Sequence, residues 1–409
     1  MMDTLDQRVL SNGMVILGEP MEAVQSVAYD FFLPAGAARW PMGFCGAANV
    51  VSDWMFRGAG ARTSRQVSDC LDGLGLQRSS SISSSHLTVG ATLEAGNLSE
   101  ALEVFADIIL RPRLEADQFD LARQLVIDEV KSLDDEPRQK VMLKLKDQFY
   151  PSPLGRSTVG EIAELEAMTA DSVAGLVGRY GAVSDAIFSV AGKYDFDWVC
   201  RQMERLFGNA DGQGLQPVKA GPQGNRYTHI PNDGAQVHIG LMTTTARPTD
   251  EDYYDARVAI SVLSGGMSAR LFTEVREKRG LCYAVGARYH SLKEASGIMG
   301  YAGTTPDKAQ ETFDVTMEQF LHLKDGITPE ELARAKVGLK SSLILQSESS
   351  GSRAGSIGTD YYMLARVRTL DEIKRRIEET TVKSVTDFLT RNPFNDFTVV
   401  TIGPRMIDF

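Results

Sequence analysis

The chain of 409 residues is long enough to form two or three domains, each with a sizeable core. Its hydrophobic share of 43% and its charged share of 24% are those of an ordinary soluble globular protein. Its 43 basic and 54 acidic side chains give a net charge of −11, and no basic stretch is set apart, so we expect no nucleic-acid partner.

The sequence lacks the features of a membrane protein. No uninterrupted apolar run approaches membrane-spanning length, and residues 1–16 show no basic segment followed by an apolar core. We therefore expect a cytoplasmic protein with no membrane partner, or a periplasmic one if an export signal was removed. The cysteines lie far apart without a CxxC pair, which favours packed thiols over a zinc site or a disulfide framework: Cys45, Cys70, Cys200 and Cys282.

The first elements in chain order mix strands and helices. Residues 8–20 predict a hairpin that turns at Asn12 and Gly13. Residues 86–93 predict a strand with one buried face, because apolar residues occupy every second position: Leu87, Val89, Ala91 and Leu93. Two later segments carry apolar residues at three- and four-residue intervals, which indicates amphipathic helices lying on a sheet: 98–110 and 115–133.

The second part of the chain repeats the order of the first. Residues 208–225 are polar and rich in glycine and proline, and we predict that they link two halves, 1–207 and 226–409. Two pairs of similar segments recur at an offset of 211 or 212 positions: 121–133 with 332–343, and 171–180 with 383–392. The shared offset predicts a duplicated unit of about 200 residues.

The strand predicted at 235–243 and the helix predicted at 255–266 continue this pattern in the second half. Few short βαβ crossovers of regular length are present, which argues against a parallel sheet. We therefore predict an α+β fold of two homologous α/β-sandwich-like halves, each a largely antiparallel sheet covered by helices.

Residues for metal or phosphate chemistry are scarce. The five histidines are spaced too widely for a helical pair of ligands. His86 and His238 fall on the polar faces of their predicted strands, where we expect solvated or hydrogen-bonded rings and not ligands. The P-loop and GxSxG patterns are missing, and the adjacent glycines in 263–272 favour a loop before a helix over a phosphate site.

Five segments stand out in this order: LSNGMVILGEP (10–20), FFLPAGAARW (31–40), GAANVVSDWMFRGAGARTS (46–64), YPSPLGRSTVGEIAELEAMT (150–169) and SARLFTEVREKRGLCYAV (268–285). Together they resemble the pitrilysin or insulinase family of zinc metallopeptidases, the inverted zincins. The likeness covers nearly the whole chain and looks like the bacterial two-chain type, which is similar to mitochondrial processing peptidase. The resemblance implies a zinc site made by an HxxEH helix and a distant glutamate, with the glutamate inside HxxEH as general base.

On this sequence the HxxEH positions fall on Asn49, Ser52 and Asp53, and the distant glutamate falls on Glu129. Ala122 fills a supporting acidic position. An asparagine amide oxygen is a poor zinc donor, and a serine hydroxyl cannot take a proton from water as a carboxylate does. We therefore expect no metal in this chain and a polar helix face without chemistry of its own.

The second half departs less from the family. Arg276 and Tyr283 match an arginine and a tyrosine that, by the resemblance, hold the substrate backbone and stabilise the oxyanion at the zinc site. We expect Arg276 in the last turn of a helix ended by Gly280, and Tyr283 on a strand face shared with Leu281 and Val285. Without the resemblance, Tyr283 would be ordinary strand packing and Arg276 part of a solvated charged run with Glu274, Glu277, Lys278 and Arg279.

The sequence thus predicts the non-catalytic subunit of a heterodimeric zinc metallopeptidase, inactive alone. A homologous HxxEH-containing partner would supply zinc and the general base, and an extended peptide would bind along an exposed sheet edge. One alternative is a peptide-binding or scaffold protein of the same fold with no role in hydrolysis, as in the core subunits of a respiratory complex. Another is a homodimeric enzyme with an unusual metal site built from Asn49, Asp53 and Glu129.

Overall fold

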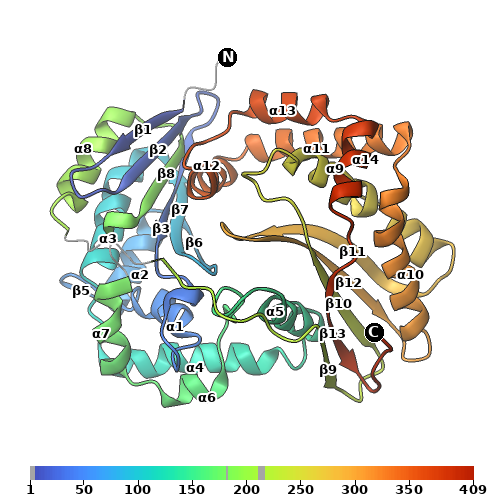
Figure 1. Cartoon of the computed structure of the whole chain (residues 1–409). Coiled ribbons are helices and arrows are strands. Elements are labelled where there is room, and N and C mark those ends of the chain that lie inside the picture. Colours follow the sequence, from blue (N-terminus) through green and yellow to red (C-terminus); the bar gives the residue numbers. More distant parts are fainter. Residues whose placement is uncertain (1–4, 181–182, 211–216) are drawn as a thin grey trace. The chain divides into compact units, whose positions relative to one another are not determined.

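The structure of the chain, a computed structural model, describes residues 5–180, 183–210 and 217–409. It forms two compact units (Figure 1). Unit 1 comprises 1–132, 156–220 and 346–367, and unit 2 comprises 133–155, 221–345 and 368–409. Each unit therefore includes one segment from the other part of the sequence. The linker at 208–225 remains a prediction, and its residues 211–216 lie outside the described residues.

Unit 1 is built on a six-stranded sheet. Its strands lie in the order β1 (Asp6–Val9), β2 (Val15–Pro20), β8 (Ile187–Gly192), β3 (Ser26–Leu33), β7 (Leu87–Glu94) and β6 (Gln77–Ile82). Only β2 and β8 run parallel among these neighbours. β1 and β2 form the predicted hairpin, and Gly13 in its turn has a φ of +96°, which suits a residue without Cβ.

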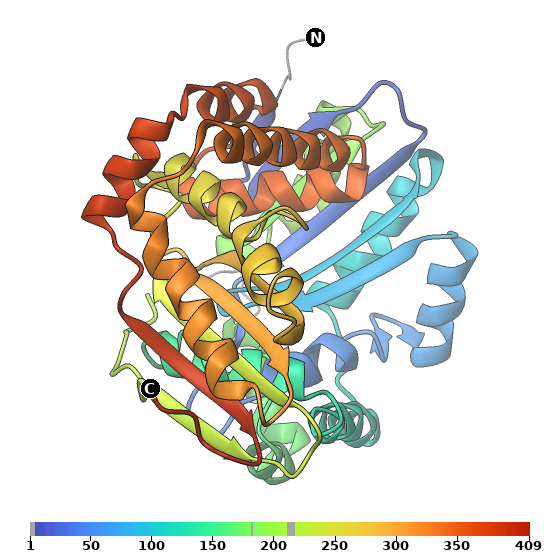
Figure 2. The ribbon, with the colours of Figure 1, turned by 90° about the vertical axis from the view of Figure 1, so that its right-hand side faces the viewer.

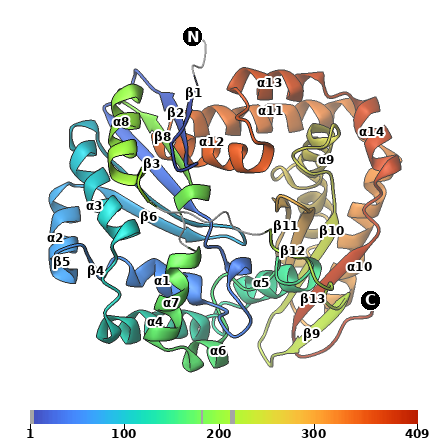
Figure 3. The ribbon, with the colours of Figure 1, turned by 60° about the vertical axis from the view of Figure 1, so that its left-hand side comes forward.

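The helices of unit 1 are α1 (Ala47–Trp54), α2 (Ser64–Gly73), α3 (Leu98–Leu110), α4 (Ala116–Ser132), α6 (Ile162–Ala167), α7 (Ala170–Tyr180), α8 (Phe196–Phe207) and α12 (Ser350–Leu364). Figure 3 shows α1, α4, α6 and α7 gathered together. Shorter elements are β4 (Gly58–Ala59), β5 (Arg62–Thr63), and the 3₁₀ turns η1 (Ala37–Arg39), η2 (Ala95–Asn97) and η3 (Val183–Asp185).

Unit 2 is built on a five-stranded sheet. Its strands lie in the order β11 (Cys282–Ser291), β12 (Ser296–Thr304), β10 (Val237–Thr244), β13 (Phe397–Gly403) and β9 (Tyr227–Pro231). Only β13 and β9 run parallel, and Figure 2 shows them side by side. The helical elements are α5 (Pro137–Phe149), α9 (Tyr253–Ser264), η4 (Phe272–Glu277), α10 (Ala309–Leu321), η5 (His322–Asp325), most of α11 (Pro329–Ser347), α13 (Leu370–Glu379) and α14 (Val382–Arg391).

The two sheets repeat one topology, which confirms the predicted α+β fold of two homologous halves. The order β2-β8-β3-β7-β6 in unit 1 corresponds to β9-β13-β10-β12-β11 in unit 2. In the parallel pairs Val15 lies opposite Ile187, and Tyr227 lies opposite Val399, with both partners displaced by the same 212 positions. The duplication therefore extends to the strand register.

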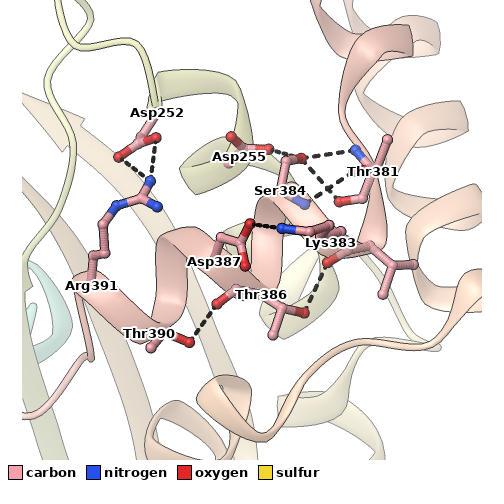
Figure 4. Close-up of polar contacts among 10 residues, drawn as sticks. Asp252, Asp255, Thr381, Lys383, Ser384, Thr386, Asp387, Thr390 and Arg391 are labelled. Carbon is pink, nitrogen blue, oxygen red and sulfur yellow. Dashed lines mark hydrogen bonds and ion pairs between the residues drawn. The ribbon is translucent and has the colours of Figure 1, made fainter.

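The same offset relates the starts of α7 and α14. Before α7 the backbone N–H groups of Thr169 and Ser172 each donate to the other residue's hydroxyl, at 3.0 and 3.2 Å. Before α14 Thr381 and Ser384 exchange the same two bonds at 2.9 and 3.0 Å (Figure 4). Each pair satisfies helix N–H groups that have no partner within the helix.

Alternation along the strands divides each sheet into two faces. In unit 1 the residues Leu87, Val89, Ala91 and Leu93 are buried in the main core, which confirms the prediction for this strand. The opposite face of the sheet is covered by α12, which contacts β2, β3 and β8. In unit 2 α5 plays the corresponding part and contacts β10 and β13.

No helix in the described part of the chain combines the length and the apolar character needed to cross a bilayer.

Candidate functional site

Helix α1 presents the three positions of the degenerate motif. It begins after Gly46, whose φ of +98° is left-handed and where a Cβ would come within 2.9 Å of the Gly160 backbone. Its apolar residues are buried in the main core: Ala47, Ala48, Val50, Val51 and Trp54. This orientation leaves Asn49 and Asp53 partly exposed, whereas Ser52 is buried.

Helix α4 packs on α1 and brings Glu129 to the motif. The Asn49 side-chain amide donates to the Glu129 carboxylate at 3.0 Å. Ala122, two turns earlier on α4, is fully buried and adds no polar group. Four predicted positions, Asn49, Ser52, Asp53 and Glu129, thus lie on two contacting helices, with Asn49 and Glu129 in direct contact.

The remaining groups of the motif have partners on α1 or just beyond its end. The Ser52 hydroxyl donates to the Asn49 backbone carbonyl at 2.8 Å. Asp53 forms an ion pair with Arg57, one turn further along. Arg57 was not among the residues predicted for the site, although its spacing of four from Asp53 is typical of an acid–arginine pair on a helix.

These groups do not suit a zinc ion. Asn49 turns its N–H toward Glu129, so its amide donates where a ligand would have to accept. The Asp53 carboxylate is held by a guanidinium whose charge opposes a cation. Among residues 5–180, 183–210 and 217–409, no group of three His, Cys, Asp or Glu side chains is arranged to hold a metal.

The second predicted pair lies in unit 2. Gly280 has a φ of +59°, and its N–H donates to the Arg276 carbonyl at 3.0 Å, which confirms Gly280 as the residue that ends this helical segment. The charged run separates into two parts. Lys278 and Arg279 pair with Glu274 at 2.7 and 2.8 Å, whereas the exposed Arg276 guanidinium lies 5.0 Å from the centre of the Phe272 ring.

Tyr283 lies at the start of the edge strand β11. The pairing with β12 shifts between Cys282 and Ala284, so Tyr283 occupies a β-bulge, and it is 62% exposed. Leu281 and Val285 pack on the unit 2 core, but Tyr283 does not join them. The predicted shared face is therefore wrong for Tyr283, because the bulge interrupts the alternation of side chains.

The histidines and cysteines behave largely as predicted. His86 Nδ1 is hydrogen-bonded to the Ser85 hydroxyl at 2.9 Å, and His238 Nδ1 is hydrogen-bonded to the Tyr301 hydroxyl at 2.8 Å. Both rings are hydrogen-bonded, as expected, and both residues are buried. Three of the four free thiols are buried as well: Cys45, Cys200 and Cys282.

Comparison with known families gives two adjoining matches. Residues 20–161 match the model described as insulinase (peptidase family M16), and residues 167–339 match the model described as the peptidase M16 inactive domain. The first match contains α1 and α4 with the degenerate motif. The second contains Arg276 and Tyr283.

Relatives and solved structures agree over almost the full length. An uncharacterized zinc protease of Mycobacterium tuberculosis is 27% identical over 384 residues, which are 92% of this chain and 88% of the relative. One of Bacillus subtilis is 27% identical over 398 residues, or 96% and 97%. A Pseudomonas fluorescens peptidase M16 inactive domain superimposes with a TM-score of 0.90 at 18% identity, covering 99% of each chain. A Helicobacter pylori protease gives a TM-score of 0.89 at 19% identity, covering 98% of this chain and all of the other.

Proposed function

Because the chain belongs to the insulinase (M16) family of peptidases, we propose that it is the non-catalytic subunit of a two-chain zinc peptidase. The observation that carries this proposal is the state of α1, where Asn49, Ser52 and Asp53 replace the motif and are engaged with Glu129, the helix backbone and Arg57. A homologous chain with an intact HxxEH helix supplies the ion and the general base.

Arg276 and Tyr283 are this chain's contribution to the reaction. In the described part of the chain the Tyr283 hydroxyl has no hydrogen-bond partner and Arg276 has no ion pair, so both can serve a substrate. A phenolic O–H donates to the oxygen that becomes negative when water attacks a peptide carbonyl. A guanidinium holds a carbonyl or carboxylate through its fixed fork of N–H groups.

The peptide itself binds in extended form, along a sheet edge. β6 is an edge strand that pairs only with β7 among the described strands, and five of its six residues are exposed. It also contacts α1. Unpaired N–H and C=O groups on such an edge bind a backbone of any sequence, so this mode gives affinity with little side-chain preference.

The test mixes this chain with a homologous HxxEH-containing chain from the same genome and follows cleavage of an unfolded peptide. The isolated chain should not cleave, and the mixture should. Tyr283→Phe should lower kcat of the mixture by about 10²- to 10³-fold, the loss typical of one oxyanion donor, with association of the two chains unchanged. Arg276→Ala should also lower turnover, whereas Lys278→Ala, in the paired part of the run, should not.

Three results would contradict the proposal. Chelator-sensitive cleavage by the isolated chain, together with one zinc per chain, would instead support the homodimeric enzyme with a site at Asn49, Asp53 and Glu129. Normal turnover of the mixture containing Tyr283→Phe and Arg276→Ala would remove their assigned roles. A stable complex that binds peptide but never cleaves it would favour the scaffold.

A further inference from the structure

Basic side chains of helix α5 and of strand β11 lie near one another in unit 2. Residues Arg138, Lys146 and Tyr150 recur at multiples of four along α5 and its end, and so lie on one side of the helix. The Tyr150 hydroxyl is 2.8 Å from His290 Nδ1. Arg288 lies two residues before His290 and so on the same face of β11, and its exposed guanidinium is near enough to act electrostatically on Lys146, one turn before Tyr150.

The charges of this cluster are not balanced by acids. Burial lowers the pKa of Lys146, and the Arg288 guanidinium lowers it further. Burial also lowers the pKa of His290 to about 4, so its ring is neutral at pH 7. Among the described residues no carboxylate forms an ion pair with Lys146, Arg288 or Arg138, and Arg138 instead lies 4.8 Å from the centre of the Tyr301 ring.

The neighbouring lysine shows the usual arrangement. Lys144, two residues earlier on α5, pairs with Asp147 at 2.7 Å. The chain has 54 acidic side chains for 43 basic ones, so carboxylates are not scarce. Holding two cations close together without a carboxylate between them opposes folding, because each charge disfavours the other in a partly desolvated site. An arrangement of this kind becomes favourable when an external anion completes it.

Position along the chain indicates which anion. β11 is an edge strand, paired only with β12 among the described strands. Arg288 lies on it five residues after Tyr283, or roughly 16 Å along an extended backbone at about 3.3 Å per residue. A peptide that reaches Tyr283 in extended form can therefore place a group at Arg288. An arginine fork and a lysine charge together match a carboxylate.

We propose that Lys146 and Arg288 bind a carboxylate of the peptide substrate, either an acidic side chain or the C-terminal carboxylate, about five residues from the bond that is cleaved. This inference rests on the proposed function, since it takes the substrate to be a peptide held near Tyr283. It gives peptide binding along the edge strand β11 a preference for acidic segments at one position.

The test measures binding to the isolated full-length chain, so it does not depend on a partner or on cleavage. The probe is a fluorescently labelled unfolded octapeptide with one glutamate and a free C-terminus, followed by anisotropy at low salt. Matched peptides carry Gln in place of Glu, or an amidated C-terminus, and these two arms distinguish the source of the carboxylate. Removal of the carboxylate that binds should weaken binding at least tenfold.

Lys146→Met and Arg288→Gln should each cause a loss of similar size for the acidic peptide and little change for the neutral one. Lys144→Gln is the matched control on the same helix and should bind like the wild type. Lys146→Glu should reverse the preference, toward a peptide with lysine in place of glutamate. Equal binding of acidic and neutral peptides by the wild type would overturn the proposal, as would wild-type selectivity in Lys146→Met and Lys146→Glu that remain folded by circular dichroism.

Discussion

Helices α12 and α5 occupy corresponding places on the two sheets but differ in how the charged side chains beside them are paired. α12 lies on the sheet of unit 1, where Arg353 and Glu19 form a two-bonded ion pair, and the two residues are only 6% and 8% exposed. α5 lies on the sheet of unit 2, where Lys146 and Arg288 share a site without a carboxylate. The cation at α12 is therefore paired with a carboxylate, whereas the two cations at α5 are not.

This difference in pairing distinguishes charged groups that stabilise the fold from charged groups that can bind a ligand. In the Glu19–Arg353 pair the two charges neutralise each other and both side chains are buried, so neither is available to a ligand. At α5 the anchoring contact is neutral, between Tyr150 and His290, and the cations beside it are left unpaired. We infer that α12 is held partly by its ion pair, whereas α5 is held by packing and by a neutral hydrogen bond.

The largest effect is expected from breaking the Glu19–Arg353 ion pair. Arg353→Met leaves the Glu19 carboxylate buried without a partner, and should lower the free energy of unfolding by about 3–5 kcal/mol in urea denaturation. The double variant Glu19→Leu with Arg353→Met removes both charges and should recover most of that loss. Equal losses in the single and double variants would mean that shape, and not charge, fixes α12.

Close packing of α12 gives a second, smaller effect. A Cβ on Gly358 would come 2.2 Å from the Phe32 ring, which is itself buried, so Gly358→Ala should cost about 1–3 kcal/mol through overpacking. Gly338, in α11, has nothing within 4 Å of the corresponding position, so Gly338→Ala should stabilise the helix by roughly 0.5–1 kcal/mol. Opposite signs in thermal unfolding would confirm that α12 lies unusually close to its sheet.

A third variant tests the neutral anchor of α5. Tyr150→Phe removes the hydroxyl that contacts His290 and should lower the free energy of unfolding by about 1 kcal/mol, well below the effect of Arg353→Met. His290→Phe with Tyr150→Phe should be less damaging than the sum of the single changes, since neither polar group is then left without its partner. Additive losses would show that the hydrogen bond contributes little.

Much of the fold could be predicted, because the alternation of apolar residues, the turn residues and the duplication can all be recognised in the sequence itself. The alternation at 87–93, the turn at Asn12 and Gly13, and the repeated offset all have their expected structural counterparts. It could not be predicted that α5 packs in unit 2 and α12 in unit 1, because the apolar face of an amphipathic helix does not identify the sheet on which it packs. The sequence could place Asp53 on a polar face, and the four-residue spacing to Arg57 was the one signal of their ion pair.

The same limit applies to the site of unit 2. Spacing and resemblance identified Arg276 and Tyr283, but a single extra residue in β11 was enough to move Tyr283 off its predicted face. Lys146 and Arg288 lie far apart in the sequence, and each alone resembles an ordinary surface charge. Only the fold brings them together, since α5 and β11 belong to different halves of the sequence and to one unit of the structure.

The smallest expected effect is a gain in stability, opposite in sign to the effect of Arg353→Met. It tests whether the charge of Lys146 on α5 is unpaired. A lowered pKa means that folding disfavours the protonated Lys146, so the unfolded chain binds that proton more tightly. Lys146→Met should therefore raise the free energy of unfolding at pH 7, by much less than Arg353→Met lowers it.

The gain should be full at pH values below the folded pKa and shrink as the pH rises toward the ordinary lysine value of 10.5, where the unfolded chain also loses the proton. Comparing urea denaturation at pH 7 and pH 9.5 measures this trend. Lys144→Met, which only breaks a partly exposed pair with Asp147, should lower the free energy of unfolding by a few tenths of a kcal/mol, about the value of such pairs. If Lys146→Met is instead strongly destabilising, as Arg353→Met is expected to be, then Lys146 has an internal partner, and neither the contrast between the two helices nor the carboxylate site can stand.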